Sequence, residues 1–386
     1  VTMRMMRFLA ILSFASTVVP AASAASPDTS PWVPREIASG VHMLEIPPDY
    51  YAAAISNVGV IEQADGFVIV DSGMSAGHGR AIVGYVRSLA ADKPIKAVVI
   101  THWHNDHPQG ISAIRDAFPK VRIIATAQTK AGMLGPEVGS LAGLAPSREV
   151  DEAARKEAGV AQEQIDKILA DPAVPEDRRA RLIRSRQQWG ELADSWPGTY
   201  IVPPTETFAR RLDIPDREHP VSIRFLGRAN TAGDAVIWLP RQKVVFSGDI
   251  VVSPIPFGFY SYPKDWVKTL GRIEKLGFVT LVPGHGAPQN DTRYIGQLIG
   301  SIEDIRAQVG PLARKGMPLA EIRKNVDFTR FEAVFATSPR LKAGFAGLWI
   351  EPMVENAMKE ALGTPIVQGE GEVQADPREK ERKKGK

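Results

Sequence analysis

Short apolar runs separated by glycine and polar residues fill the first part of the chain. Runs of this length that are rich in β-branched residues predict strands; they cover residues 41–46, 54–61, 66–71, 95–100 and 121–125. One stretch, 76–90, instead repeats its apolar positions at the spacing of a helix face. The rhythm changes over about 127–197, where two polar amphipathic helices are predicted at 147–169 and 176–193.

Strand-like runs return in the second half of the chain, at 200–202, 222–226, 235–239, 243–246 and 280–282. A helix is predicted at 264–275, and from 291 to 362 the pattern is helical throughout. This mixture predicts the α/β class. We expect the C-terminal helices to pack on the rest of the chain or on a second copy. In the second case they would form a homo-oligomer.

The two ends of the chain have compositions of their own. Arg4 and Arg7 precede an apolar stretch and an Ala-rich segment ending near Ala24, which is the layout of a signal peptide over residues 1–24. We therefore expect an exported protein, periplasmic or secreted, that is not held to a membrane after cleavage. Residues 364–386 are predicted to be a disordered charged tail.

Composition narrows the chemistry. The chain has 386 residues, a net charge of +3 and no cysteine. The absence of cysteine excludes disulfides, thiolate ligands and cysteine nucleophiles. No basic face with interleaved aromatic residues is visible, so nucleic acid is not an expected partner, and a small-molecule substrate is.

Three of the seven histidines fall in one short segment, Thr-His-Trp-His-Asn-Asp-His over residues 101–107. His102, His104, Asp106 and His107 directly follow the predicted strand at 95–100. Imidazole and carboxylate are ligands that zinc prefers. On a helix His102 and His104 would point about 200° apart, so a loop suits them better. The segment therefore predicts a metal site on a loop after a strand.

A strand followed by H-x-H-x-D-H and a helix resembles the metallo-β-lactamase-fold hydrolases. Four other segments are similar to motifs of that family, in the same order: 66–73 with Asp71, 227–234 with Asn230 where the family usually has histidine, 246–249 with Asp249, and 283–286 with His285. The resemblance implies an αββα four-layer sandwich over 26–290. The helical stretch at 127–197 would be an insertion near the metal edge that could serve as a lid, and 291–363 a helical extension.

The resemblance also implies two metal positions. His102, His104 and Asn230 would form the first, Asp106, His107 and His285 the second, and Asp249 would be shared. We expect one or two divalent ions, zinc first, with Mn²⁺ and Fe²⁺ as alternatives, and expect Asp106 and Asp249 to act in catalysis. An amide oxygen is a weaker and harder donor than imidazole. Three states therefore stay open: two metals with a weak first site, one metal in the second site, or a second metal acquired with substrate.

Other residues are expected to support this site. Asp71 is predicted to order the metal loop by hydrogen bonds. Thr231 and Asp234 are predicted to organise the Asn230 loop, in which Gly233 is expected at a positive φ. A run of aromatic residues after Asp249 predicts an apolar wall for the substrate; its members are Phe257, Phe259, Tyr260 and Tyr262.

These features together predict an exported hydrolase that uses a metal-activated water to cleave an ester, thioester, lactone or amide. A β-lactamase proper is the named alternative. Zinc β-lactamases, however, usually carry cysteine or serine where Asp249 stands, so the chain is more similar to the glyoxalase II and lactonase branches. A mononuclear iron oxygenase and a non-catalytic metal-binding relative are further alternatives.

Overall fold

The computed structural model describes residues 30–135, 143–368 and 372–373. The predicted signal peptide lies outside the described residues, as does most of the predicted tail. Within the described parts of the chain, no helix is both long and apolar enough to cross a membrane.

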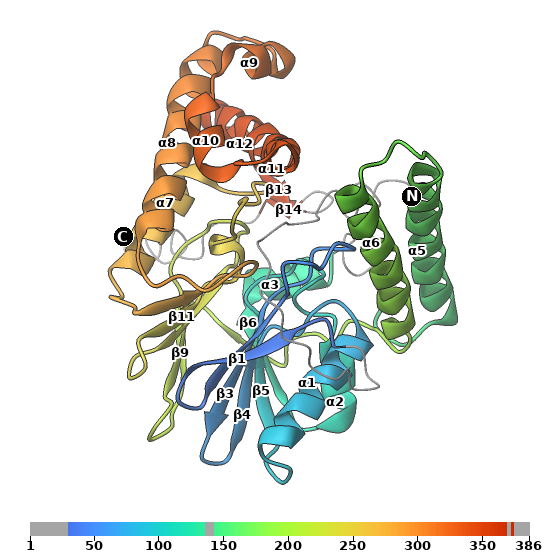
Figure 1. Cartoon of the computed structure of the whole chain (residues 1–386). Helices are drawn as coiled ribbons and strands as arrows, with labels where there is room; N and C mark the ends of the chain where they lie inside the picture. The colour runs from blue at the N-terminus through green and yellow to red at the C-terminus, as the bar shows by residue number, and fades with distance from the viewer. Residues whose placement is uncertain (1–29, 136–142, 369–371, 374–386) are drawn as a thin grey trace, which may run out of the picture.

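Seven strands form the first sheet, ordered as in the chain (Figure 1). They are β1 (Val33–Ala38), β2 (Val41–Glu45), β3 (Val58–Gln63), β4 (Gly66–Val70), β5 (Ile95–Val99), β6 (Arg122–Thr126) and β7 (Glu206–Phe208). The strands from β1 to β4 pair antiparallel, whereas those from β4 to β7 pair parallel. Parallel pairing brings the carboxyl ends of β4 and β5 to one edge of the sheet.

The second sheet has the order β12-β11-β10-β9-β8. Its strands are β8 (Arg211–Ile214), β9 (Val221–Phe225), β10 (Ala235–Leu239), β11 (Val244–Phe246) and β12 (Thr280–Val282). β11 and β12 pair parallel, and the other neighbours pair antiparallel. The carboxyl ends of β11 and β12 therefore also meet at one edge.

The inner core lies between the two sheets. Side chains alternate along a strand, so β10 contributes Ile237 and Leu239 to this core while Val236 and Trp238 face the other side. Val68 and Val99 of the first sheet belong to the same inner cluster as Ile237. All of these side chains are buried, and this packing fixes the two sheets face to face.

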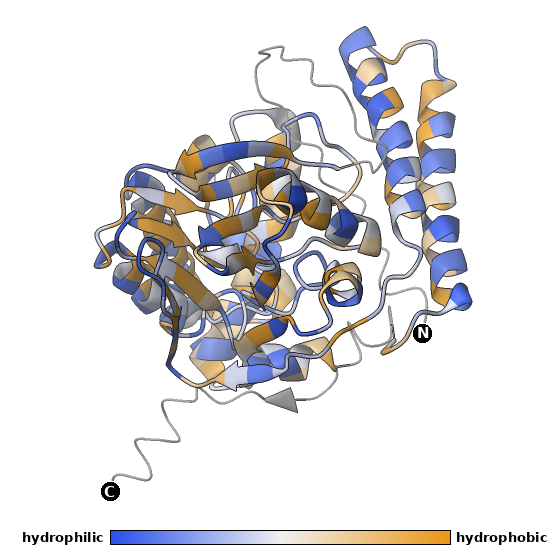
Figure 2. Cartoon of the chain, turned by 90° about the horizontal axis from the view of Figure 1, so that it is seen from below, coloured by the Kyte–Doolittle hydropathy of each residue, from blue (hydrophilic) through white to orange (hydrophobic). Residues whose placement is uncertain are grey.

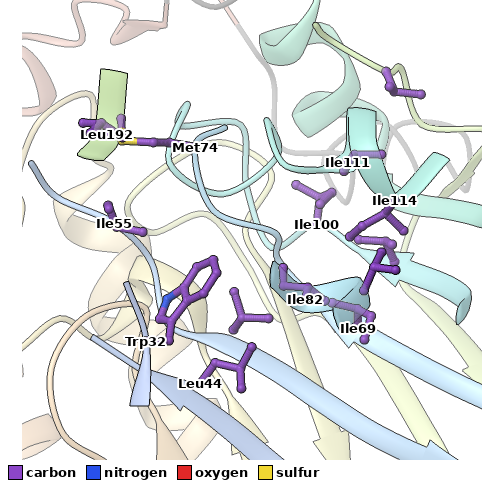
Figure 3. Close-up of a cluster of buried hydrophobic side chains, with 14 of the residues drawn as sticks. Trp32, Leu44, Ile55, Ile69, Met74, Ile82, Ile100, Ile111, Ile114 and Leu192 are labelled. Carbon is purple, nitrogen blue, oxygen red and sulfur yellow. The ribbon is translucent and has the colours of Figure 1, made fainter. Parts of the chain in front are cut away.

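Helices cover both outer faces. On the first sheet, α1 (Ala76–Leu89) and α2 (Ile111–Ala117) bury Ile82 and Ile114 against Ile69, in the cluster drawn in Figure 3. On the second sheet lie α7 (Pro263–Glu274), α8 (Arg293–Arg314) and α12 (Glu351–Leu362). Trp266 of α7 packs against Trp349 of the turn before α12, and Trp349 donates to Ser301 of α8. The predicted αββα architecture is confirmed.

The remaining helices belong to the two helical regions. The C-terminal region also holds α9 (Leu319–Asn325), α10 (Thr329–Phe335), α11 (Pro339–Gly344) and a π-helical turn at Phe345–Ile350. The stretch from 127 holds α3 (Ala127–Met133), α5 (Arg148–Leu169) and α6 (Glu176–Ser195). α5 and α6 form an antiparallel pair beside the sandwich (Figure 1), and many of their residues are hydrophilic (Figure 2).

Two predicted elements are wrong. No strand occurs at 200–202: Pro203 and Pro204 have no N–H to donate, and the Ile201 N–H donates to the Gly143 carbonyl at 2.8 Å. The strands in this part of the chain are instead β7 and β8, each at an edge of its sheet. The predicted tail also begins too early, because Ile366 is buried with Tyr262 and Ala232, and β13 (Val367–Gln368) pairs with β14 (Glu372–Val373). Apolar burial at Ile366 outweighs the charge of the segment that follows.

Candidate metal centre

The predicted ligands come together on loops at one edge of the sandwich. His102 to His107 follow β5, Asp249 follows β11 on a short 3-10 turn, and His285 follows β12. Each loop leaves the carboxyl end of a strand with a parallel neighbour, which is why residues nearly two hundred positions apart meet.

The first cluster contains His102, His104 and Asp249, whose ligand atoms lie within 4.8 Å of one another. His102 Nε2 is 3.0 Å from His104 Nδ1 and 3.6 Å from Asp249 Oδ2. Burial lowers the pKa of both imidazoles, that of His104 to about 4. Both rings are therefore neutral at pH 7 and keep a lone pair for a metal.

The second cluster contains Asp106, His107 and His285. His285 Nε2 lies 3.1 Å from Asp106 Oδ2, and His107 Nε2 lies 3.5 Å from the same oxygen. Burial acts to lower the pKa of these imidazoles, but the carboxylates around them outweigh it. The pKa of His107 is well above its usual value, and that of His285 is raised to about 9. The cluster thus favours positive charge.

Asp249 joins the two clusters. Besides its contact with His102, its Oδ1 lies 3.4 Å from His107 Nε2 and 3.5 Å from His285 Nε2. Gly284 leaves room for this carboxylate: a Cβ there would lie 1.9 Å from Asp249 Oδ1. Gly284 is therefore required by close approach, and Gly286 by its φ of +91°.

Asp71 and Thr101 fix the orientation of His107. Asp71 Oδ1 accepts from Thr101 N at 2.8 Å, and Oδ2 accepts from Thr101 Oγ1 at 2.8 Å and from His107 Nδ1 at 2.9 Å. A carboxylate can only accept, so a neutral His107, the form that binds a metal, carries its proton on Nδ1 and presents the lone pair of Nε2 to the cluster. This is the arrangement predicted for Asp71.

The Asn230 loop is organised as expected around Asp234. Its carboxylate accepts from the backbone N–H of Ala229 and Thr231, at 3.0 and 2.8 Å, and from Thr231 Oγ1 at 2.9 Å. Asn230 is fully buried; its Nδ2 donates to the Phe257 carbonyl at 2.8 Å, while its Oδ1 has no hydrogen-bond partner. The amide oxygen is thus available as a metal ligand.

The expectation for Gly233 is wrong. Its φ is not among the positive values. Glycine is needed for space instead, because a Cβ would lie 2.5 Å from Thr126 Oγ1 and 2.8 Å from the Thr129 backbone nitrogen. The turn packs directly on the start of α3.

The donor set fits a divalent cation. Four ligand atoms are buried without a hydrogen-bond partner in the described structure: Asp106 Oδ2, His107 Nε2, Asp249 Oδ1 and His285 Nε2. Buried polar atoms normally have partners, and leaving them unpaired is costly. Their chemistry, imidazole nitrogen with carboxylate oxygen, is that of zinc and neighbouring divalent ions. The two clusters are therefore candidate metal sites.

Three of the four predicted wall residues lie near these clusters. The Phe257 ring is 5.3 Å from that of His285, and the Phe259 ring lies 6.1 Å from that of Phe257, tilted by 36°. Tyr260 lies 6.2 Å from Trp103, the neighbour of His104. Tyr262 differs: it is buried beneath Arg228 at 4.3 Å, and its hydroxyl faces the Ile366 carbonyl at 3.4 Å. Its hydroxyl is thus directed to the C-terminal segment.

Asn57 is a supporting residue that sequence reasoning missed. Its Nδ2 donates to the carbonyls of Pro283 and Gly286, at 3.0 and 2.8 Å, and its Oδ1 accepts from Ile46 N at 3.2 Å. It therefore holds the loop that carries His285. No local signal marks it, because the two carbonyls that it holds lie more than two hundred residues away.

Comparison with known proteins gives a consistent assignment. Residues 52–285 match the model of the metallo-beta-lactamase superfamily. A linear primary-alkylsulfatase from Pseudomonas sp. (strain ATCC 19151) is 26% identical over 268 residues, which are 65% of this chain and 45% of the relative.

A solved alkylsulfatase structure has the same fold. The stereoselective inverting sec-alkylsulfatase Pisa1 from Pseudomonas sp. superposes with a TM-score of 0.57 at 18% identity, over 84% of this chain and 50% of its own. A metallo-beta-lactamase from Pontibacter korlensis gives a TM-score of 0.46 at 17% identity, over 70% of this chain and 99% of its own. The chain spans about half the length of the alkylsulfatases that it matches.

Proposed function

The chain belongs to the metallo-beta-lactamase superfamily, and from its two His/Asp clusters and its alkylsulfatase relative we propose that it hydrolyses alkyl sulfate esters. The observation that carries metal-dependent hydrolysis is the meeting of four buried ligand atoms without partners at one edge of the sandwich. The relative's activity supports the choice of a sulfate ester over the carboxylic esters, lactones and amides that the family also suggests.

The reaction consumes one water and releases an alcohol and hydrogen sulfate. Divalent ions, when bound, lower the pKa of a coordinated water and stabilise negative charge on a leaving oxygen. His102, His104 and Asp249 would hold one ion, to which the unpartnered Asn230 oxygen would add a further ligand. Asp106, His107 and His285 would hold the other.

The chain's own residues prepare this site in two ways. Asp71 keeps the His107 proton on Nδ1, away from the cluster. The Phe257 ring shields His285 on its apolar side, which lowers the local dielectric and strengthens electrostatic interactions there.

Charge also makes metal dependence a direct expectation. Asp106 and Asp249 are buried carboxylates whose pKa values lie below the usual range, because the neighbouring imidazoles outweigh burial. Without a metal these carboxylates are paired with the protonated imidazoles of His107 and His285, so the site lacks the net positive charge that would attract an anionic sulfate ester. We expect chelation to abolish both binding and turnover of the ester.

The test is sulfate release from decyl sulfate by the purified protein, measured by ion chromatography with and without chelator and after metals are restored. A chromogenic β-lactam, a lactone and a thioester are assayed in parallel, and elemental analysis counts the ions per chain. The Asp249→Asn variant, prepared identically, controls for contaminating sulfatases. Sulfate release that is lost on chelation supports the proposal. Turnover of another class, with no sulfate released by the metal-restored protein, overturns it.

Export is a separate proposal that rests on the sequence of residues 1–24. N-terminal sequencing of the protein recovered from the periplasm or medium tests it: a start at Ala25 supports cleavage after Ala24, and an intact N-terminus in the cytosol contradicts it.

A further inference from the structure

A small cavity lies between the helical insertion and the loops of the metal centre. Its volume is about 70 Å³, several times the roughly 10–15 Å³ that a single water molecule needs. Side chains of α5 and α6 form most of its wall, and two loop residues complete it. The lining residues are Met74, Asn105, Val150, Ala153, Ala154, Glu157, Ala158, Trp189, Leu192, Ala193 and Trp196.

The wall is apolar because both helices turn small or apolar residues toward the cavity. On α5, Val150, Ala153, Ala154 and Ala158 recur at the spacing of one helix face, and their small size leaves room between the helices and the loops. Leu192 approaches Met74 from α6, as Figure 3 shows. A space of this kind suits hydrocarbon.

The cavity borders the metal loop through two of its lining residues. Asn105 stands between the predicted ligands His104 and Asp106. Met74 follows Asp71 on the loop after β4, and that loop is tied to the metal loop by the Gly73 carbonyl, which accepts from Gln109 N at 3.1 Å. The cavity therefore lies against the loop that carries His104 and Asp106.

The walls are held in place by hydrogen bonds to the sandwich. Gln188 on α6 accepts from Tyr51 N at 2.6 Å and donates to the Asp49 carbonyl at 2.9 Å. Ser195 Oγ lies 2.7 Å from Ser75 Oγ, and both are buried. These bonds fix α6 against the loops, so the space exists before a ligand arrives.

Charge decides which end of an alkyl sulfate would lie here. Among the described residues that line the cavity there is no lysine, arginine or histidine, and Glu157 is the one acidic side chain. An anionic sulfate has no cation to pair with and a carboxylate to avoid. We propose that this cavity takes up the alkyl chain of a sulfate ester whose sulfate group lies at the metal centre; this inference rests on the proposed function.

Chain length is the first readout. For linear primary alkyl sulfates from butyl to dodecyl, kcat/KM is expected to rise about fourfold for each methylene that enters the cavity, the equivalent of about 0.8 kcal/mol. The rise is expected to stop after a few methylenes because the cavity is small. A kcat/KM that does not change with chain length overturns the inference.

Filling the cavity is the second readout. Ala154→Leu places three extra carbons in the space and is expected to lower kcat/KM for decyl sulfate at least tenfold, with butyl sulfate little affected. Ala161→Leu is the matched control, since Ala161 lies on the same helix, is also partly buried and does not line the cavity. Equal losses in both variants, or no loss in either, contradict the assignment.

Alkyl sulfonates separate this inference from the proposed function, because their C–S bond is not a sulfate ester. Their binding to the metal-loaded protein is measured by calorimetry. Affinity that rises with chain length and falls in Ala154→Leu supports the cavity even if no sulfate ester is turned over. If sulfate esters are hydrolysed but the sulfonate affinity changes neither with chain length nor in Ala154→Leu, the proposed function is supported and the role of the cavity is overturned.

Discussion

Replacing Asp71 by asparagine tests how the second cluster is prepared for a metal. The change keeps size and shape, and asparagine tolerates the φ of 60° that Asp71 adopts, so backbone strain is not the cause of any effect. What changes is that one of the two accepting oxygens becomes a donor. Asp71 uses both oxygens, toward Thr101 and His107.

Neither orientation of the new amide can satisfy both partners. With its NH₂ toward His107, the imidazole has to accept at Nδ1 and move its proton to Nε2, which removes the lone pair from the cluster. With its NH₂ toward Thr101 N, two donors face each other. A hydrogen bond to a charged group contributes about 1.5–3 kcal/mol, and loss of such a partner lowers metal affinity about 10–100-fold.

The assay is a metal titration of the chelator-stripped protein, with urea unfolding of the same samples. We expect Asp71→Asn to weaken one class of site about 10–100-fold and to destabilise the metal-free protein by about 1.5–3 kcal/mol. Asp65→Asn is the control, because Asp65 is exposed on the β3–β4 turn and pairs with Lys96, away from the metal clusters. Wild-type affinity at every site in Asp71→Asn would refute the reasoning.

Three further predictions concern Asp249, Asn57 and His78. Asp249→Asn should reduce the metal content of both clusters and lower hydrolysis more than about 100-fold, since Asp249 contacts His102, His107 and His285; elemental analysis showing one cluster still full would contradict its shared role. Asn57→Ala should lower the free energy of unfolding in urea by about 1–3 kcal/mol and weaken metal binding, because the His285 loop loses the two hydrogen bonds that Asn57 Nδ2 donates; unchanged metal affinity would show that the loop keeps its position without Asn57. Burial lowers the pKa of His78 to about 3, so the unfolded state binds more protons below pH 6.5 and stability should fall by up to about 1.4 kcal/mol per pH unit as the pH drops toward 3. With chelator present, His78→Asn, whose Oδ1 can accept from Met74 N as His78 Nδ1 does, should lose about 2 kcal/mol less than wild type between pH 6.5 and 5; equal slopes would count against a neutral His78.

Much of the fold was accessible from the sequence because its strands and helices carry strong local patterns. The apolar run at 95–100 predicts β5, and the spacing in 176–193 predicts α6 to within two residues. Predictions were wrong where the local pattern is weak. β7 and β8 are short and partly exposed edge strands, and their positions depend on pairing with β6 and β9. Pairing of this kind is not encoded in a segment's own composition.

In the candidate site, too, the residues of local motifs were predictable from the sequence, and those that depend on distant contacts were not. The sequence by itself determined which residue types stand at the ends of the strands, because a metal loop is a local motif: His102 to His107 supply imidazoles and a carboxylate within six positions. It also determined the departure at Asn230. Both features are properties of neighbouring residues.

Tertiary structure alone decided how those residues combine. It placed Asp249 beside both clusters, fixed the His107 proton through Asp71, and gave Asn57 its role in holding the His285 loop. It also formed a cavity from helix faces that look merely amphipathic in sequence. The physical reason is that proton position, burial and shape depend on contacts between distant segments, which exist only once the two sheets have packed.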